Sequence, residues 1–262
     1  VSAMHLSTGI SACRQTGIRE LFFTMWGDNG GFCLYDSALA GLELCCGVAY
    51  GEQADQEAFY SRRFQAICGE NYRLYEAAAT LQYCSSSNIL WDDPLQGSAL
   101  LECEYRETLS EYRQKLTKLQ TNLDNRPVLS GKLQAVRVLA ALLLSKIRLR
   151  QELLAAYSRR DRGTLRNLAE EAIPGILCRI GEFDELFRAD WLETAKPFGL
   201  EVIQRRNAGL AARYRELRRL LLEFLGGTLP RIAELDASQE AASAVRETGF
   251  TPDNIYSGSC WI

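Results

Sequence analysis

Histidine is almost absent from this chain, since His5 is the one histidine among 262 residues. A histidine general base therefore has no support, because the sequence shows no nucleophile that would accompany His5. The nine cysteines form no C-x-x-C pair, so no zinc-ligand spacing is found and no metal or other cofactor is implied. We expect reduced cysteines in a cytoplasmic protein. Those expected inside helices as small buried hydrophobic residues are Cys13, Cys45, Cys68, Cys103 and Cys178.

Long apolar runs are lacking as well. The longest near the middle of the chain, residues 138–144, lies between Arg137 and Lys146 and is far shorter than the roughly 20 residues of a membrane span. It predicts a buried helix and no membrane partner. The sequence opens at Val1 without the basic region, apolar stretch and cleavage site of a signal peptide. We expect it to begin inside a longer protein.

The charges are too balanced for a nucleic-acid partner. Thirty basic residues face 33 acidic ones, which gives a net charge of −3 and no electrostatic footprint for a polyanion. One cluster of arginines is interleaved with glutamates along a single helical pattern, and it comprises Arg205, Arg206, Arg213, Arg215, Arg218 and Arg219. We interpret the cluster as a solvated helix face, with a phosphate-binding surface as the alternative.

Beyond Gly69 the sequence is almost entirely helical in character. Apolar residues recur at steps of three and four, which predicts amphipathic helices. Pro174 predicts a kink in the third helix. Short connections favour an antiparallel bundle, and its apolar seams would also suit a homodimer. The helices are predicted over residues 101–123, 133–154, 164–187 and from Pro197 to Gly226.

A loop is predicted over residues 83–97, where serines, Asn88 and Pro94 interrupt any helix. Within it, Asp92 and Asp93 invite two interpretations. Two acids beside a cleft would suit general acid and base chemistry in a glycosidase. Adjacent residues of an extended loop point apart, however, and an acid before proline is typical of a helix entry. We favour a structural junction in which one of these aspartates is a cap.

A short buried strand is predicted over residues 21–25, and Trp26, Gly27 and Asp28 follow it in a glycine-rich loop. The flanking segments 6–18 and 34–50 are predicted to be helices. In parallel α/β sheets and barrels, ligands bind at the carboxyl ends of strands. An indole and a carboxylate at this point favour a sugar pocket. The alternative is a packed tryptophan before a solvated turn.

These residues resemble a known family. The segment with Trp26-Gly27-Asp28 is similar to the last strand and flanking helices of the barrel in family 20 glycoside hydrolases, the exo-β-N-acetylhexosaminidases. The likeness is greatest to the branch in which a helical domain follows the barrel. Three later segments resemble the same branch, and they are residues 58–69, 90–97 and 191–213.

The resemblance implies a mainly α chain with two parts. Residues 1–68 would be the last helix, strand and helix of a (β/α)8 catalytic barrel, and residues 69–262 an antiparallel helical domain with an irregular tail after Ala237. The upstream barrel would be the first partner of this chain. The rival interpretation is a noncatalytic helical scaffold or interaction protein in which Trp26 belongs to the core.

The resemblance also assigns two substrate-binding residues and no catalytic residue. Trp26 would wall the pocket of a terminal N-acetylhexosamine, and Asp28 would accept hydrogen bonds from sugar hydroxyls at the non-reducing edge. Many relatives have glutamate in place of Asp28, which leaves the gluco or galacto preference open. The family cleaves by substrate assistance with an Asp-Glu pair from an earlier strand. That pair is absent here, so this chain alone is expected to be inactive.

Overall fold

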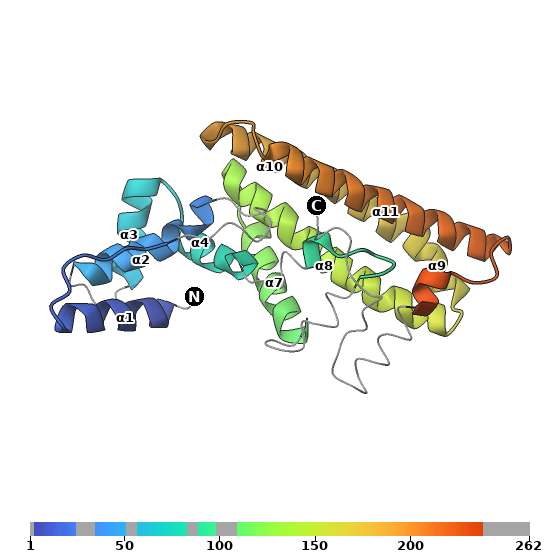
Figure 1. Ribbon diagram of the computed structural model, residues 1–262, viewed down its shortest axis with the longest axis horizontal. Helices are drawn as coiled ribbons and strands as arrows, with labels where there is room; N and C mark the ends of the chain where they lie inside the picture. The colour runs from blue at the N-terminus through green and yellow to red at the C-terminus, as the bar shows by residue number, and fades with distance from the viewer. Residues whose placement is uncertain (1–2, 25–34, 51–56, 83–88, 98–108, 238–262) are drawn as a thin grey trace. The chain divides into compact units, whose positions relative to one another are not determined.

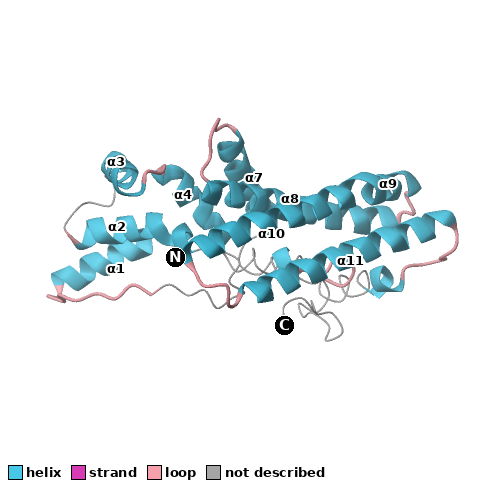
Figure 2. Ribbon diagram, turned by 90° about the horizontal axis from the view of Figure 1, so that it is seen from above, coloured by secondary structure: helices cyan, strands magenta, loops and turns pink. Residues whose placement is uncertain are grey.

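The computed structural model describes residues 3–24, 35–50, 57–82, 89–97 and 109–237, and the regular secondary structure in these ranges is helical (Figures 1 and 2). The chain divides into two compact units, residues 1–82 and 83–262. No helix in the described ranges combines the length and the apolar character needed to cross a membrane.

The first unit is a cluster of short helices. Helices α1 and α2 pack side by side, and the Arg14 guanidinium of α1 donates to the Val48 carbonyl of α2 at 3.2 Å (Figure 2). As predicted, α1 stops at a glycine, since Gly17 has a φ of 77° that glycine adopts without strain. Its elements are α1 (Ala3–Gln15), η1 (Tyr35–Ala38), α2 (Leu39–Ala49), α3 (Glu57–Cys68), α4 (Tyr72–Ala78) and η2 (Ala79–Gln82).

Aromatic rings form the core between α3 and α4. The Phe64 ring centre lies 5.6 Å from that of Tyr72 and 5.3 Å from that of Tyr75, both in tilted or edge-on geometry that aromatic pairs favour. Helix α2 joins this cluster through an ion pair in which Arg63 Nε lies 2.5 Å from Glu43 Oε1. The first unit therefore has a small core of its own.

The strand predicted over residues 21–25 is not formed in the part that the structure describes. Residues 21–24 are irregular, Phe22 is 95% exposed, and Met25 lies outside the described residues. A strand needs a second strand to pair with its amides and carbonyls, and the described ranges contain none. The barrel element of the predicted fold class is therefore not confirmed.

The second unit contains the long helices, and all four predicted helices are confirmed within the described residues. Residues 101–108 of the first of them lie outside those ranges. The last helix ends at Gly226 as predicted, and Gly227, with a φ of 81°, caps its carboxyl end. The elements are α7 (Leu109–Asp124), α8 (Gly131–Ser158), α9 (Arg162–Asn167), η4 (Leu168–Ala172), α10 (Ile173–Thr194) and α11 (Leu200–Gly226).

The third predicted helix changes character before its proline. A π-helical turn, η4, separates α9 from α10, and Pro174 lies in the first turn of α10. Proline has no amide hydrogen to donate to the preceding turn, and a widened π turn accommodates that loss. A kink is predicted at Pro174, and the structure has a change of helix type just before this residue.

Three long helices pack together in the second unit. Helix α10 packs against both α8 and α11, and the three run alongside one another (Figures 1 and 2). Helices α8 and α11 also meet, since the Tyr157 and Phe224 ring centres lie 5.4 Å apart. Helix α7 packs on α8. The apolar run 138–144 lies within α8 and includes the fully buried Leu142 and Leu143, as predicted.

The predicted helical placement of the cysteines is confirmed at Cys13, Cys45, Cys68 and Cys178, but the predicted burial is complete only at Cys45 among these four, with Cys13 and Cys68 half-buried. Cys45 is buried in α2, where burial raises the pKa of its thiol. Cys178 is exposed, because α10 buries Ile176 and Ile180 and position 178 points away from that stripe. Cys103 lies outside the described residues.

Candidate functional site

Trp26 and Asp28, the two predicted substrate-binding residues, lie outside the described residues. Their assignment to a sugar pocket therefore stays a prediction. The other constellation singled out in the sequence, Trp91 with Asp92 and Asp93, falls in a described stretch. We call residues 89–97 the junction segment, because they follow the end of the first unit at residue 82.

The junction segment is buried despite its irregular backbone. Residues 89–91 form a short helical piece and residues 94–96 a turn, so the predicted loop is correct for the second half of the segment only. Leu90 and Leu95 are fully buried, and Trp91 is 2% exposed. A buried stretch without continuous helical or sheet pairing needs hydrogen-bond donors for its carbonyl groups.

Two cations of α8 supply those donors. Lys146 Nζ lies 3.0 Å from the Leu90 carbonyl oxygen and 2.9 Å from that of Asp92. Arg150 donates through Nη1 to Pro94 at 2.7 Å, and it also reaches the carbonyls of Leu95 and Gly97, each at 3.2 Å. Five carbonyl groups of the junction segment are thus held by two buried side chains.

The same two cations belong to a wider polar cluster. The Lys146 ammonium lies 5.1 Å from the centre of the Tyr214 ring on α11, and burial raises the pKa of that tyrosine. Burial lowers the pKa of Arg150, and the charges of Asp92 and Asp93 oppose this change. The aspartates therefore compensate the buried positive charge.

Asp93 has the capping role that the sequence predicted. Its Oδ1 accepts from the amides of Leu95 at 2.8 Å and Gln96 at 2.9 Å, which closes the turn after Pro94. Its Oδ2 lies 2.5 Å from Arg213 Nε on α11. Burial by itself raises the pKa of Asp93, but the hydrogen bonds from Arg213 and the two amides outweigh burial and lower it below 3.8.

The acid and base interpretation of Asp92 and Asp93 is wrong. Both residues are buried, with exposed fractions of 6% and 9%. The cavity beside them, which Lys146, Arg150 and Tyr214 also line, has a volume of about 10 Å³. That volume holds at most one water molecule, so no sugar ring enters it. The two carboxylates stabilise the fold.

The arginines of α11 are also less solvated than the sequence suggested. Arg213 bridges Asp93 and Glu234, with Nη2 at 2.6 Å from Glu234 Oε1. The Arg206 guanidinium lies 5.5 Å from the centre of the Trp91 ring, and Arg218 Nε donates to the Ala169 carbonyl at 2.9 Å. The solvated-face interpretation is therefore wrong for Arg206 and Arg213, which are half-buried. The other four arginines of the cluster are exposed as predicted, and they are Arg205, Arg215, Arg218 and Arg219.

The sequence pattern does not identify Lys146 and Arg150 as site residues. The available signal was a pair of cations inside the buried pattern of α8, where Leu143, Ile147 and Leu153 occupy the same apolar stripe. A charge on such a stripe requires a buried partner. The partners of these two cations are main-chain carbonyl groups more than fifty residues away in the sequence. Because the partners are not side chains, the sequence pattern does not indicate them.

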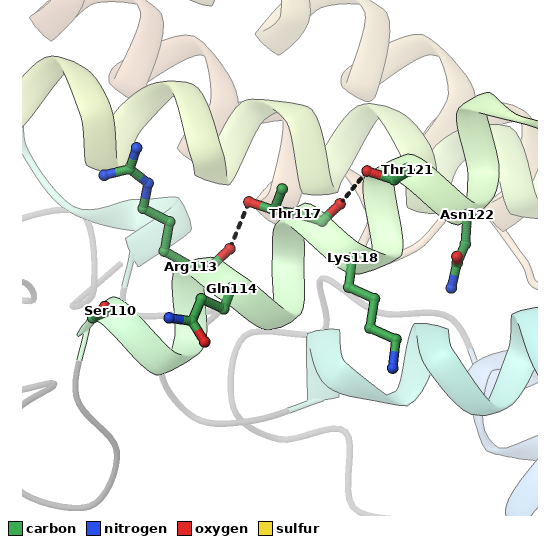
Figure 3. Close-up of a pocket in the computed structure, with 7 residues that line it drawn as sticks. All are labelled: Ser110, Arg113, Gln114, Thr117, Lys118, Thr121 and Asn122. Atoms are coloured by element: carbon green, nitrogen blue, oxygen red, sulfur yellow. Dashed lines mark hydrogen bonds between the residues drawn. The ribbon is translucent and has the colours of Figure 1, made fainter.

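A larger hollow lies over the exposed face of α7 (Figure 3). Its volume is about 530 Å³, and its described lining contains hydroxyls, amides and two cations but neither a carboxylate nor an aromatic ring. Thr117 and Thr121 direct their hydroxyls to the carbonyls of Arg113 and Thr117, at 2.8 and 2.9 Å. The described face of this hollow therefore offers no acid for catalysis and no ring to stack on a sugar.

Gly97 cannot accept a side chain without moving Asp92. An added Cβ would lie 2.2 Å from a carboxylate oxygen of Asp92. We expect Gly97→Ala to lower the free energy of unfolding by about 1–3 kcal/mol, as overpacking of a buried site does. Urea unfolding measures this. Gly209→Ala on α11, where an added Cβ meets nothing within 4 Å, is the control and should be neutral or slightly stabilising. Equal stability of the two variants would contradict the predicted clash.

The lowered pKa of Asp93 makes part of the stability depend on pH. Ionised Asp93 stabilises the fold at pH values above its ordinary 3.8, and this contribution is lost as the pH falls through the lower folded value. We expect Asp93→Asn to lower the free energy of unfolding by about 2 kcal/mol at pH 7. The loss is smaller than that expected for a fully buried ion pair, because the Arg213 side chain is 35% exposed.

The difference between Asp93→Asn and the parent chain should narrow below about pH 4, because Asp93 of the unfolded parent chain binds a proton there before the folded carboxylate does. Urea unfolding at a series of pH values measures it. Asp124→Asn on the exposed face of α7 is the matched control and should follow the parent. A difference that stays constant from pH 7 to pH 3 would refute the role of this carboxylate.

One comparison with known proteins identifies the family of this chain. A family model described as the Glycoside Hydrolase 20C C-terminal domain matches residues 71–249. The match begins at Asn71, which caps α4 by accepting from the Leu74 amide at 3.2 Å, and it covers the junction segment and all the long helices. A comparison with curated proteins finds no match. The chain belongs to glycoside hydrolase family 20, and residues 71–249 are its carboxyl-terminal helical domain.

Proposed function

We propose that this chain is the carboxyl-terminal part of an exo-β-N-acetylhexosaminidase, which removes terminal β-linked N-acetylhexosamine from glycans. The observation that carries the proposal is the family match over residues 71–249, which shows that the chain belongs to glycoside hydrolase family 20. The sequence Trp26-Gly27-Asp28 precedes the matched domain, in the order expected of a last barrel strand before a helical domain. A cytoplasmic location belongs to the same proposal.

The chain would contribute one wall of the sugar pocket. Trp26 would cover the apolar face of the terminal sugar, and Asp28 would accept hydrogen bonds from its hydroxyls. Cleavage would be substrate-assisted and retaining, with the sugar's acetamido oxygen as nucleophile. The acid that protonates the leaving oxygen, and the aspartate that orients the acetamide, would come from upstream barrel strands. By itself this chain should not turn over a chromogenic N-acetylglucosaminide.

The helical domain would have a structural role in the enzyme. The paired aspartates at positions 92 and 93 are used within the fold, as the hydrogen bonds of Asp93 illustrate. The division into a barrel remnant over residues 1–68 and a helical domain from residue 69 stays a prediction. So does a homodimer formed through the long helices. The rival function is a noncatalytic scaffold, and the following test separates the two.

Asp28→Asn in the intact enzyme tests the proposal. The variant keeps the shape of the side chain but removes its charge, so hydrogen bonds to sugar hydroxyls should weaken by about 1–3 kcal/mol. We expect kcat/KM to fall about tenfold to a hundredfold, with little change in melting temperature. Glu20→Gln removes the same charge from an exposed side chain eight positions earlier in the sequence and should leave kcat/KM unchanged.

The opposite pattern would favour the rival interpretation. If Asp28 only closes a turn, Asp28→Asn leaves kcat/KM at the parent value and changes at most the melting temperature. Unaltered kcat/KM would remove Asp28 from the sugar pocket. Absence of hexosaminidase activity in the intact enzyme itself would refute the proposed reaction.

A further inference from the structure

The chain returns to the junction segment after its last long helix. Residues 232–236, which we call the latch, include Ile232 and Leu235, both buried to 1% exposure or less. The hydroxyl of Tyr157 on α8 fixes the latch, since it accepts from the Ile232 amide at 2.7 Å and donates to Asp236 Oδ1 at 3.0 Å. The Tyr157 hydroxyl thus joins both ends of the latch to α8.

The latch and the junction segment share one cation. Glu234 Oε1 accepts from Arg213 Nη2 at 2.6 Å, and Arg213 also binds Asp93 of the junction segment. Glu234 Oε1 further accepts from Gln96 Nε2 at 2.8 Å. Two stretches that lie 138 residues apart at Gln96 and Glu234 are therefore joined directly and through Arg213.

We propose that the latch and the junction segment open and close as one cooperative unit on the surface of α8 and α11. Side chains anchor both stretches: Tyr157 holds the latch, and Lys146 and Arg150 hold the junction segment. Release of the latch removes the Glu234 carboxylate from Arg213 and Gln96, and it opens the buried Asp93 carboxylate to water. In that wetter environment the ion pair from Arg213 to Asp93 weakens, and the turn that Asp93 closes loses its support.

This coupling makes the latch a conformational device. The junction segment lies shortly after residue 82, where the first unit ends. In this proposal its attachment to α8 and α11 depends on the latch. A change that displaces the latch would loosen the chain at its entry into the second unit while α8, α10 and α11 stay packed. Local opening of this kind is measured by native-state hydrogen exchange.

Tyr157→Phe in the full 262-residue chain tests the coupling. It removes the hydroxyl that holds the latch, keeps the ring against Phe224, and deletes no contact to the junction segment. We expect the Ile232 amide to exchange about tenfold faster. The amides of Leu95 and Gln96, which donate to Asp93, should accelerate by a similar factor.

A second variant acts at the other end of the latch. Glu234→Gln weakens the bonds to Arg213 and Gln96, and it should accelerate the same three amides even if Tyr157→Phe fails to fold. Glu216→Gln, which removes a surface ion pair with Arg219 on α11, is the control and should leave them unchanged. Faster exchange at Ile232 with unchanged exchange at Leu95 and Gln96 would overturn the proposal, as would unchanged exchange at all three amides.

Discussion

The second unit depends on one hydrogen-bonding constraint, which is that a buried, irregular stretch of main chain must find donors. The junction segment meets it through Lys146 and Arg150, which bind five of its carbonyl groups. The need to bind these carbonyl groups explains why α8 has two cations on a buried face. It also explains why Asp92 and Asp93 lie close enough to compensate buried positive charge. Helix α11 is attached to the same segment through the ion pair between Arg213 and Asp93.

Buried ion pairs are often replaceable by apolar residues at little cost, but this cluster differs in its partners. Carbonyl groups of the main chain cannot be removed by substitution, so loss of a donor leaves them unsatisfied in the interior. The same argument assigns the two aspartates to the fold. The Asp93 carboxylate is bonded to a cation and two amides, Asp92 is buried near Arg150, and the neighbouring cavity is no larger than one water. This part of the family 20 domain therefore supports the structure.

Local sequence features predicted the helices well, because a stripe of apolar residues and a stop signal act within a few residues of each other. The end of α11 at Gly226, before the cap Gly227, and the capping by Asp93 are of this kind. The strand over residues 21–25 failed in its described part because a strand depends on partners elsewhere. The roles of Lys146 and Arg150 are not predictable from local sequence for a related reason, since their acceptors are carbonyl groups far away in the chain. Trp26 and Asp28 stay predictions.

The most direct measurement of the central constraint is the free energy of unfolding of Lys146→Met beside Lys118→Met. Both variants replace an ammonium by a flexible apolar group, but Lys146 is buried against two carbonyl groups and Lys118 is exposed on α7. We predict a loss of about 2–4 kcal/mol for Lys146→Met in urea unfolding, and a change within about 0.5 kcal/mol for Lys118→Met. Equal stability of the two variants would contradict the account.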